Sequence, residues 1–505
     1  SQEEIQAVTQ HAYEMGQELD LSEAETRRLI DQQLALAGWD VDSNELTYKK
    51  GTRPQKGRNL AIAEWPVEGG RADYILFIGL EVVGVVEAKR KAKDVAAAIE
   101  QAKRYSRSYV IRADEAPPGG PWGEYKIPFL FSTNGRPYLR QLEERSGIWF
   151  LDARLPTNHP RALTGWYTPA GLQASLQCDV EAAHTRLNAE SPDYLPLRDY
   201  QKDAVLAAEQ GIQQGHRSLL LAMATGTGKT RTCIGLCYRL IKSKRFNRIL
   251  FLVDRTSLGE QATNAFKDVR MENLQAFTDI YDVKELGDLR PDDDTRLHMA
   301  TVQSMMRRIL FQSDEQTPIP IDAYDCIVVD ECHRGYALDR EMSDDELQFR
   351  SEGDYLSKYR RTIEHFDAVR IGLTATPALH TTEIFGRPIY QYSYRQAVID
   401  GYLVDHDPPF QLRTELNEGG ITWEVGEQVE AFDHHTGTVT TFTTPDQISI
   451  EVDGFNQKVI TEPFNRTVCE QLARHIDPAL PGKTMIFCVN DSHADLVVRL
   501  LKQAT

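Results

Sequence analysis

Two carboxylates and an ammonium group stand at the ends of one hydrophobic stretch of the sequence. The stretch reads RADYILFIGLEVVGVVEAKR, with Asp73 near its start and Glu87 and Lys89 near its end. If it turns back near Gly79 as an antiparallel hairpin, residues whose numbers sum to about 160 face each other, so that Asp73 lies opposite Glu87. Lys89 lies on the face of Glu87, because side chains alternate along a strand. Paired carboxylates predict a site for Mg²⁺, which activates water and polarises phosphate oxygens, while the ammonium group stabilises developing charge.

A second group of reactive side chains follows an apolar segment near the middle of the chain. The sequence LLLAMATGTGKTRT (219–232) places two glycines, a lysine and a threonine where a strand is expected to give way to a helix. Glycines let backbone N–H groups surround phosphates, Lys229 can reach the β- and γ-phosphate oxygens, and Thr230 can ligate Mg²⁺. The strict pattern fails at one position, since Met223 stands where the first glycine is expected. The stretch predicts an ATP-binding loop made of Thr225, Gly226, Thr227, Gly228, Lys229 and Thr230.

Both groups need a scaffold that brings strand ends together. Short apolar strands alternate with helical segments from about 195 to 390, which is typical of a parallel, doubly wound α/β sheet. Before it, the hairpin, a helix expected at 92–109 and two helices within the first 40 residues indicate a separate α/β domain. Near the end, KTMIFCV (483–489) and the segment after it predict a strand followed by a helix. We therefore expect an α/β chain with a domain at 1–175, a linker at 176–194, an ATP-binding lobe at 195–390 and the incomplete start of a second lobe at 391–505.

The composition is that of a globular chain with an acidic surface. A chain of 505 residues is too long for one core, and its formal net charge of −18 argues against binding nucleic acid through overall charge. DNA contacts are instead expected at local basic stretches such as 89–93 and 103–109. The polar start indicates that there is no signal peptide, and no apolar run reaches the ~20 residues that a membrane-spanning helix needs. We therefore expect a cytoplasmic protein.

Cysteine and histidine usage points away from a zinc site. The seven cysteines include no CxxC pair, which indicates a reducing compartment. Cys233 and Cys237 lie one helical turn apart and are expected to pack in a core, since no second pair completes a ligand set. The adjacent His434 and His435 are expected to be loop residues.

The hairpin pattern resembles the PD-(D/E)xK nuclease superfamily, whose signature is an acid, a gap, and then Asp or Glu two residues before Lys. Here Asp73, Glu87 and Lys89 carry it, although an alanine stands where the pattern has a proline. Gln101 and Tyr105, at i and i+4 of the following helix, match a QxxxY pair that lies beside the carboxylates in nucleases attached to motors. The resemblance implies Mg²⁺ held by the two acids, with the other three residues assisting catalysis.

Two questions about this site stay open from the sequence. The superfamily often carries a further metal-binding glutamate on its first helix, and Glu25 matches it, yet Glu25 is equally well explained as a capping-box residue in SEAE. The D…ExK pattern could also be a charged hairpin end at the sheet surface, because short patterns recur by chance.

The second half of the chain resembles superfamily 2 helicases and translocases in five boxes that occur in order. CIVVDECH (326–333) matches the D-E-x-H box, which implies that Asp330 holds Mg²⁺, Glu331 activates the attacking water and His333 couples hydrolysis to the DNA site. The segments LVDRTSLGEQ (252–261) and TVQSM (301–305) match those that grip a nucleic-acid strand.

Two further matches concern the nucleotide. LTATP (373–377) matches the box whose threonines, here Thr374 and Thr376, link ATP state to domain closure. LRDYQ matches an adenine-reading segment and implies that Arg198 and Gln201 contact the base. IFCVND (486–491) resembles the first box of a second motor lobe, so we expect the later boxes, including an arginine finger, to be absent and ATP turnover by this chain alone to be poor.

The order of a nuclease domain and a motor resembles the restriction (R) subunit of type I restriction-modification enzymes. The strings MATGTGKTRT, VVDECHRGY and GLTATP carry the resemblance, which covers nearly the whole chain. It implies a subunit that translocates double-stranded DNA with ATP, cuts it with Mg²⁺ away from the recognition site, and docks on methyltransferase (M) and specificity (S) subunits.

Two other functions remain open. One is a stand-alone helicase-nuclease of DNA repair or defence that needs no methylase partner. The other is a nucleotide-switched DNA-binding module whose hairpin is only structural. The substitutions Lys89→Ala and Lys229→Ala separate these, because the first affects only cutting if the hairpin is a nuclease site and the second removes both activities.

Overall fold

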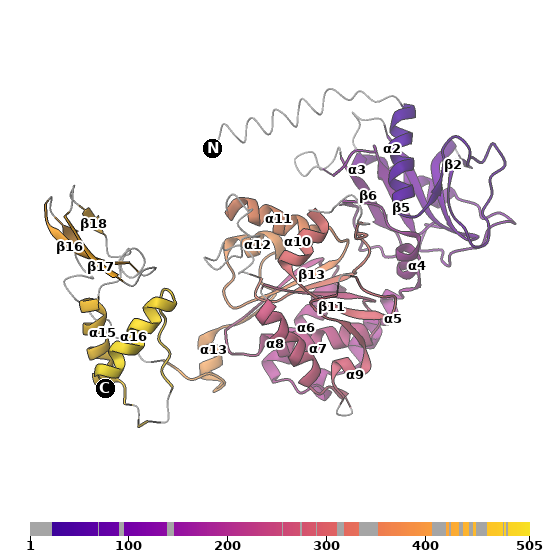
Figure 1. The fold of residues 1–505 in the computed structure, drawn as a ribbon. Helices are drawn as coiled ribbons and strands as arrows, with labels where there is room; N and C mark the ends of the chain where they lie inside the picture. The colour runs from indigo at the N-terminus through magenta and orange to yellow at the C-terminus, as the bar shows by residue number, and fades with distance from the viewer. Residues whose placement is uncertain are drawn as a thin grey trace. The chain divides into compact units, whose positions relative to one another are not determined.

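The computed structural model describes residues 23–504 except for 69, 90–94, 139–145, 255, 273–274, 289, 311–317, 333–351, 407–420, 424–425, 434–437, 444–447, 451–461, 478 and 481–482. The first expected helix, His333 and the pair His434 and His435 lie outside the described residues. The chain divides into two compact units between Val404 and Asp405 (Figure 1). None of the helices in the described ranges is long and apolar enough to cross a bilayer.

The first unit begins with a domain built on a seven-stranded mixed sheet, drawn indigo to purple in Figure 1. Its strands follow one another across the sheet in chain order, with β1 parallel to β2, β4 parallel to β5 and the other neighbours antiparallel. The strands are β1 (Asp40–Val41), β2 (Asn59–Val67), β3 (Gly70–Ile78), β4 (Glu81–Ala88), β5 (Phe129–Thr133), β6 (Ile148–Asp152) and β7 (Arg161–Leu163). The described helices are α2 (Glu23–Leu36), α3 (Val95–Ser108), α4 (Pro169–Gln177) and α5 (Val180–Ala189).

Helices α2 and α3 cover opposite faces of this sheet, which explains why its central strands are apolar on both sides. Tyr74 and Leu76 of β3 pack in the core that includes Ile30 and Leu34 of α2. The intervening residues of β3 pack in a second core with Ile99 and Ala102 of α3. Helix α2 ends near Gly38, whose φ of 91° suits a glycine at a helix C-terminus, as the sequence predicts.

The hairpin register predicted from the sequence is confirmed. Tyr74 pairs with Val86 and Ile75 with Val85, so the residue numbers sum as expected. The two-residue turn contains Gly79 at φ 61°, in the left-handed region that favours glycine. A bulge at Val83 shifts the register nearer the turn. Because the bulge adds one residue, it reverses the face on which the later side chains of β4 lie. Val85 therefore packs on the α3 side of the sheet. Glu87, two residues further on, lies on the same face.

The second part of the first unit is an all-parallel sheet in the order β10-β11-β9-β12-β13-β8-β14, which confirms the predicted parallel α/β lobe. The strands are β8 (Ser218–Met223), β9 (Ile249–Val253), β10 (Asp282–Lys284), β11 (Thr295–Thr301), β12 (Cys326–Val329), β13 (Val369–Thr374) and β14 (Tyr390–Tyr392). The described helices are α6 (Asp199–Gln213), α7 (Lys229–Lys242), α8 (Thr256–Asp268), α9 (Phe277–Ile280), α10 (Val302–Leu310), α11 (Glu352–Glu364), α12 (Leu379–Phe385) and α13 (Tyr394–Ile399).

Helices lie on both faces of the parallel sheet, as a doubly wound connection requires. Alternate strand residues pack with α6, α7, α8 and α9 in one core, and the residues between them pack with α10, α11 and α12 in the other. Cys233 and Cys237 are fully buried in the first of these cores, as predicted. The residues 391–404, which the sequence analysis assigned to the second lobe, stay with this unit, since β14 pairs with β8 and Ala397 of α13 is buried beside Tyr200.

The second unit contains two antiparallel strand pairs and two helices among its described residues. Strand β15 (Ile421–Trp423) pairs with β18 (Ile448–Ile450), β16 (Gln428–Asp433) pairs with β17 (Thr438–Thr443), and α15 (Glu462–His475) packs on α16 (Asp491–Ala504). The helix expected after residue 489 is therefore present, but the strand expected at 483–489 does not form. A parallel strand needs a neighbour to complete its hydrogen bonds, and Met485 and Phe487 are 77% and 87% exposed.

Candidate functional site

The end of the hairpin and one face of α3 form a connected polar cluster. The ammonium group of Lys89 donates to Glu87 Oε1 at 2.5 Å and to Gln101 Oε1 at 2.8 Å. Gln101 in turn donates through Nε2 to the Tyr105 hydroxyl at 2.5 Å. The structure thus brings together four of the five residues expected from the hairpin and QxxxY patterns. The bulge in β4 accounts for this, because it directs Glu87 toward the helix that carries the other pair.

Asp73 lies next to this cluster through the hairpin backbone. Its Oδ2 accepts a hydrogen bond at 2.7 Å from the backbone amide of Ala88, the residue between Glu87 and Lys89 in the sequence. Its Oδ1 accepts from Arg27 of α2 at 3.2 Å. Asp73 is thus held between the hairpin partner strand and the first helix, and its negative charge acts on Glu87.

Two residues near this site were missed by the sequence analysis. Arg27 joins Asp73 to Glu64 of β2, whose Oε1 accepts from it at 3.1 Å. Ala63 pairs with Tyr74, and Trp65 pairs with Ala72. Glu64 and Asp73 therefore lie opposite each other on neighbouring strands. Glu64 has a φ of 54°, a conformation that costs a non-glycine residue energy and that recurs at functional sites. The sequence carries no signal for this backbone conformation.

The electrostatics of Glu87 are unusual for a carboxylate. The residue is 3% exposed, and burial, followed by the nearby charge of Asp73, raises the pKa of Glu87 to about 7 even though Lys89 opposes the shift. Its second oxygen, Oε2, is buried without a hydrogen-bond partner. An unsatisfied buried carboxylate oxygen is costly, and a cation would satisfy it. The residues therefore fit a divalent cation. Proteins commonly bind Mg²⁺ through one or two carboxylates, and the ion keeps several waters.

Glu25 does not join this group. In the part of the chain that the structure describes, no three His, Cys, Asp or Glu side chains lie close enough to hold a metal ion together. Glu25 is exposed on α2, two residues before Arg27. Residues two apart on a helix point about 200° away from each other, so turning Arg27 toward Asp73 turns Glu25 away. The third acid expected from α2 stays a prediction, and the contact that α2 makes with Asp73 comes from Arg27.

The predicted ATP-binding loop connects β8 to α7. Gly228 is the residue before α7 and has a φ of 79°, and Gly226 has a φ of 85°. Gly228 also has no room for a side chain, because a Cβ there would lie 2.6 Å from Gln201 Nε2. Both glycines are needed, since L-residues rarely adopt these angles. Of the neighbouring threonines, Thr227 is buried and donates to the Ala224 carbonyl at 2.6 Å, while Thr225 is exposed.

Gln201 and Arg198, expected near the adenine, contact the same loop. Gln201 Nε2 donates to the carbonyl oxygens of Thr227 and Gly228 at 2.9 and 3.2 Å. Its Oε1 accepts from the backbone amide of Arg198 at 3.0 Å, at the first turn of α6. The guanidinium of Arg198 lies over the Tyr402 ring at 4.7 Å. The two residues thus link the start of α6 to the loop that would carry the phosphates.

The ends of β8, β12 and β13 bring the other nucleotide residues to the loop. Lys229 is 6% exposed and lies 3.1 Å from Glu331 Oε1. Thr230 Oγ1 donates to Asp330 Oδ2 at 3.3 Å. Burial, followed by the adjacent Glu331, raises the pKa of Asp330 above its ordinary value. This hydroxyl and carboxylate pair fits Mg²⁺, which prefers oxygen ligands.

Sheet order explains the position of the remaining threonines. Strand β13 lies between β12 and β8, so Thr374 at its end lies between the Asp330 strand and the loop strand. Thr374 is fully buried, and its hydroxyl accepts from the amide of Thr376 at 3.1 Å. Glu331 has a φ of 48°, so the backbone is strained where this strand end meets the loop.

The parallel sheet and its glycine loop define a P-loop ATPase lobe joined to a mixed-sheet α/β domain. Residues 40–176 match the family model of the type I restriction enzyme EcoKI endonuclease subunit second domain, and residues 194–379 match that of the type III restriction enzyme, res subunit. The chain is 48% identical to the type I restriction enzyme EcoKI endonuclease subunit of Escherichia coli strain K12, over 96% of this chain and 44% of that protein. Over nearly its whole length, the chain is thus similar to an endonuclease subunit of a type I restriction enzyme.

Two further matches are more distant. The chain is 28% identical to the type I restriction enzyme EcoAI endonuclease subunit of Escherichia coli, over 92% of this chain and 52% of that protein. A solved fragment described as an HsdR subunit of a type I restriction enzyme from Vibrio vulnificus YJ016 is 22% identical, over 96% of this chain and 74% of that chain, with a TM-score of 0.35. The chain thus spans 44% and 52% of the length of the first two relatives.

Proposed function

We propose that the chain acts in the cytoplasm as the endonuclease and ATP-driven double-stranded DNA translocase subunit of a type I restriction enzyme. Similarity to these endonuclease subunits and the ATP-binding loop support the motor activity, and the hairpin cluster supports the nuclease activity. Methyltransferase and specificity subunits would supply the recognition site, and cutting would occur away from it. ATP and Mg²⁺ would be the cofactors.

One observation carries the nuclease part. The buried Glu87 has an unsatisfied oxygen, Oε2, while Lys89 contacts its other oxygen and the charge of Asp73 acts on it. We infer a PD-(D/E)xK nuclease site in which Asp73 and Glu87 hold Mg²⁺. When bound there, the cation would lower the pKa of a water and polarise the scissile phosphate. Lys89 would stabilise the charge that develops on the phosphate, and Gln101 and Tyr105 would hold Lys89 in place.

The ATP site would work through strand ends that meet at one edge of the sheet. Backbone amides of the loop from Thr225 to Gly228 would bind phosphates, while Lys229 would neutralise the β- and γ-phosphates. Thr230 and Asp330 would hold Mg²⁺, and Glu331 would take the proton from the attacking water. Arg198 and Gln201 would bind near the base, and Thr374, Thr376 and His333 would couple nucleotide state to DNA.

The nuclease assignment is tested by Lys89→Ala in the assembled enzyme, with linearisation of a circular plasmid bearing one recognition site as the readout. The matched control is Lys50→Ala, because Lys50 is an exposed lysine of the same domain that pairs with Glu45. Cutting should fall by on the order of 10²-fold or more in the first variant, with ATP hydrolysis retained, and stay near wild type in the second. Normal cutting by the Lys89 variant would reduce the hairpin to a structural element.

A further inference from the structure

The N-terminal domain and the ATP-binding lobe meet around one buried carboxylate. Arg161 of β7 donates to Asp367 through Nε at 2.7 Å and through Nη2 at 2.6 Å. Arg217 donates to the same carboxylate at 2.5 Å, and the Tyr167 hydroxyl donates to it as well. The Asp367 side chain is only 3% exposed. The two guanidinium groups hold the pKa of Asp367 well below its usual range, so the carboxylate is ionised and shared between the domains.

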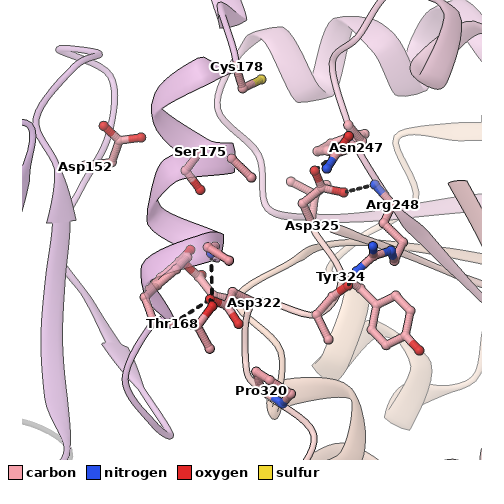
Figure 2. A pocket seen from close by; sticks show the side chains of 18 of the residues that line it. Asp152, Thr168, Ser175, Cys178, Asn247, Arg248, Pro320, Asp322, Tyr324 and Asp325 are labelled. Atoms are coloured by element: carbon pink, nitrogen blue, oxygen red, sulfur yellow. Dashed lines mark hydrogen bonds between the residues drawn. The ribbon is translucent and has the colours of Figure 1, made fainter. Parts of the chain in front are cut away.

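A second set of contacts joins the same two domains (Figure 2). Asp322 of the lobe accepts hydrogen bonds from the Thr168 amide at 2.7 Å and the Thr168 hydroxyl at 2.6 Å. Thr168 caps helix α4, and a Cβ on Gly171 of that helix would lie 1.7 Å from Asp322 Oδ2, so only glycine allows this approach. Ile321 is buried in the core of the N-terminal domain although it belongs to the lobe. We refer to Arg161, Tyr167 and Thr168 with Arg217, Ile321, Asp322 and Asp367 as the interdomain interface.

The interface lies at the starts of the strands whose ends carry the ATP residues. Arg217 immediately precedes β8, which leads to the glycine loop. Asp322 comes shortly before β12, which leads to Asp330, and Asp367 comes shortly before β13, which ends at Thr374. Because these strands are parallel, their starts share one edge of the sheet and their ends share the opposite edge. The N-terminal domain therefore holds the lobe at the edge opposite the nucleotide.

Opening this interface would leave charges without partners. If Arg161 moved away with its domain, Asp367 would keep only Arg217, and Arg161 would have to be rehydrated. Breaking one partner from a buried ion group is strongly unfavourable. A cavity of about 490 Å³ is lined by residues of both domains (Figure 2). Arg161, Asp322 and Asp367 are among the residues that line it. The arrangement resists hinge motion between the two domains.

We propose that the N-terminal domain and the ATP-binding lobe form one rigid body joined through Asp367, so that the hairpin site moves with this lobe throughout the ATP cycle. Asp367 is then a positioning residue, since it lies at the end of the parallel strands opposite the ATP-binding loop. The consequence of this rigid body for translocation and cutting rests on the proposed function, but the rigid connection itself does not.

A reversible disulfide across the interface tests the rigid body in the assembled enzyme. Gly165→Cys with Ile321→Cys is suitable, because a Cβ at position 165 would lie 3.1 Å from Ile321 Cγ2. ATP hydrolysis and plasmid cutting are compared before and after reduction of the same sample, with each single cysteine variant as control. We expect the locked and reduced forms to agree within twofold. A locked form that loses tenfold or more activity and regains it on reduction would overturn the proposal.

A second measurement does not depend on activity. Hydrogen exchange mass spectrometry over a denaturant series gives separate unfolding midpoints for peptides of β2 to β4 and of β8 to β9 in this chain. We expect coincident midpoints in the wild type, separated midpoints in Asp367→Asn, and a smaller separation in Tyr167→Phe. Asp268→Asn, at an exposed position of α8, is the control and should leave them coincident. Separate midpoints in the wild type would overturn the rigid body, even if ATP turnover and cutting are normal.

Discussion

The hairpin site and the ATP loop use the same pair of side chains on different scaffolds. Lys89 contacts Glu87 at 2.5 Å, and Lys229 lies 3.1 Å from Glu331. In the ATP loop, glycines and the ends of parallel strands collect the residues at one sheet edge. In the hairpin, antiparallel register and one bulge do so. A lysine and a glutamate in contact therefore do not define a chemistry, and under the proposed function the surrounding backbone decides which phosphate can reach them.

The two sites also differ in how their carboxylates are satisfied. Asp330 has the Thr230 hydroxyl as partner, whereas Glu87 keeps a buried oxygen without one. Near the hairpin, Arg27 supplies positive charge to Asp73 and Glu64. Glu87 is consequently a carboxylate whose protonation should respond to a divalent cation.

The largest expected difference between the sites comes from Lys229→Ala. Without this ammonium group the loop cannot neutralise the nucleotide phosphates, so ATP hydrolysis and ATP-dependent cutting should both fall by on the order of 10²-fold or more. In Lys89→Ala only cutting should fall. Parallel measurement of ATP turnover and plasmid cutting in the assembled enzyme checks this. Equal losses of both activities in the two variants would mean that the sites are not separate.

A smaller effect is expected from Gly228→Ala. A Cβ there meets Gln201 Nε2 at 2.6 Å and the φ of 79° is unfavourable for alanine, so nucleotide binding should be lost and unfolding made easier by about 1–3 kcal/mol. Gly57→Ala is the matched control, because it has a φ of 77° with nothing within 4 Å of its Cβ. Denaturant unfolding of both variants separates backbone strain from the clash, and equal destabilisation would contradict the proposed tight fit at Gln201.

Metal binding at the hairpin should depend on pH. Glu87 has a pKa of about 7 in the metal-free protein, and a protonated carboxyl cannot ligate Mg²⁺, so affinity should rise about tenfold between pH 6 and pH 8. Without metal, the folded chain keeps a proton on Glu87 that the unfolded chain releases. Stability from this group is therefore present below the ordinary glutamate pKa and is lost as pH rises through about 7.

Glu87→Gln is the control for the pH dependence. Calorimetric titration of Mn²⁺ should show the rise in the wild type and none in this variant. An affinity in the wild type that is flat from pH 6 to pH 8 would show that Glu87 is not a ligand.

The smallest expected effect comes from Arg27→Ala. Arg27 is partly exposed and competes with a cation for Asp73, so its removal should raise Mn²⁺ affinity by about two- to fivefold, as a partly exposed ion pair allows. Arg28→Ala on the exposed side of the same helix is the control. Weaker Mn²⁺ binding in the Arg27 variant would mean that Arg27 orders the acids instead of competing for them.

Local patterns predicted much of this fold. The glycine loop, the short apolar strands expected in the lobe and the hairpin register follow from contiguous residues, and the structure contains them. The bulge at Val83 could not be predicted, because it depends on how β4 pairs with β3. The strained backbone of Glu64 could not be predicted either, because it depends on how β2 pairs with β3. The role of Arg27 likewise depends on how a helix docks on the sheet. The strand expected at 483–489 failed for the converse reason, since apolar residues alone do not make a strand without a partner.

The most direct test of the hairpin site is an anomalous difference map from a crystal soaked with Mn²⁺ and a non-hydrolysable ATP analogue. The account predicts one peak about 2.0–2.2 Å from Glu87 Oε2 and an Asp73 oxygen, and a second peak beside Thr230 that proves the soak worked. A second peak without the first would contradict the metal site on which the nuclease assignment depends.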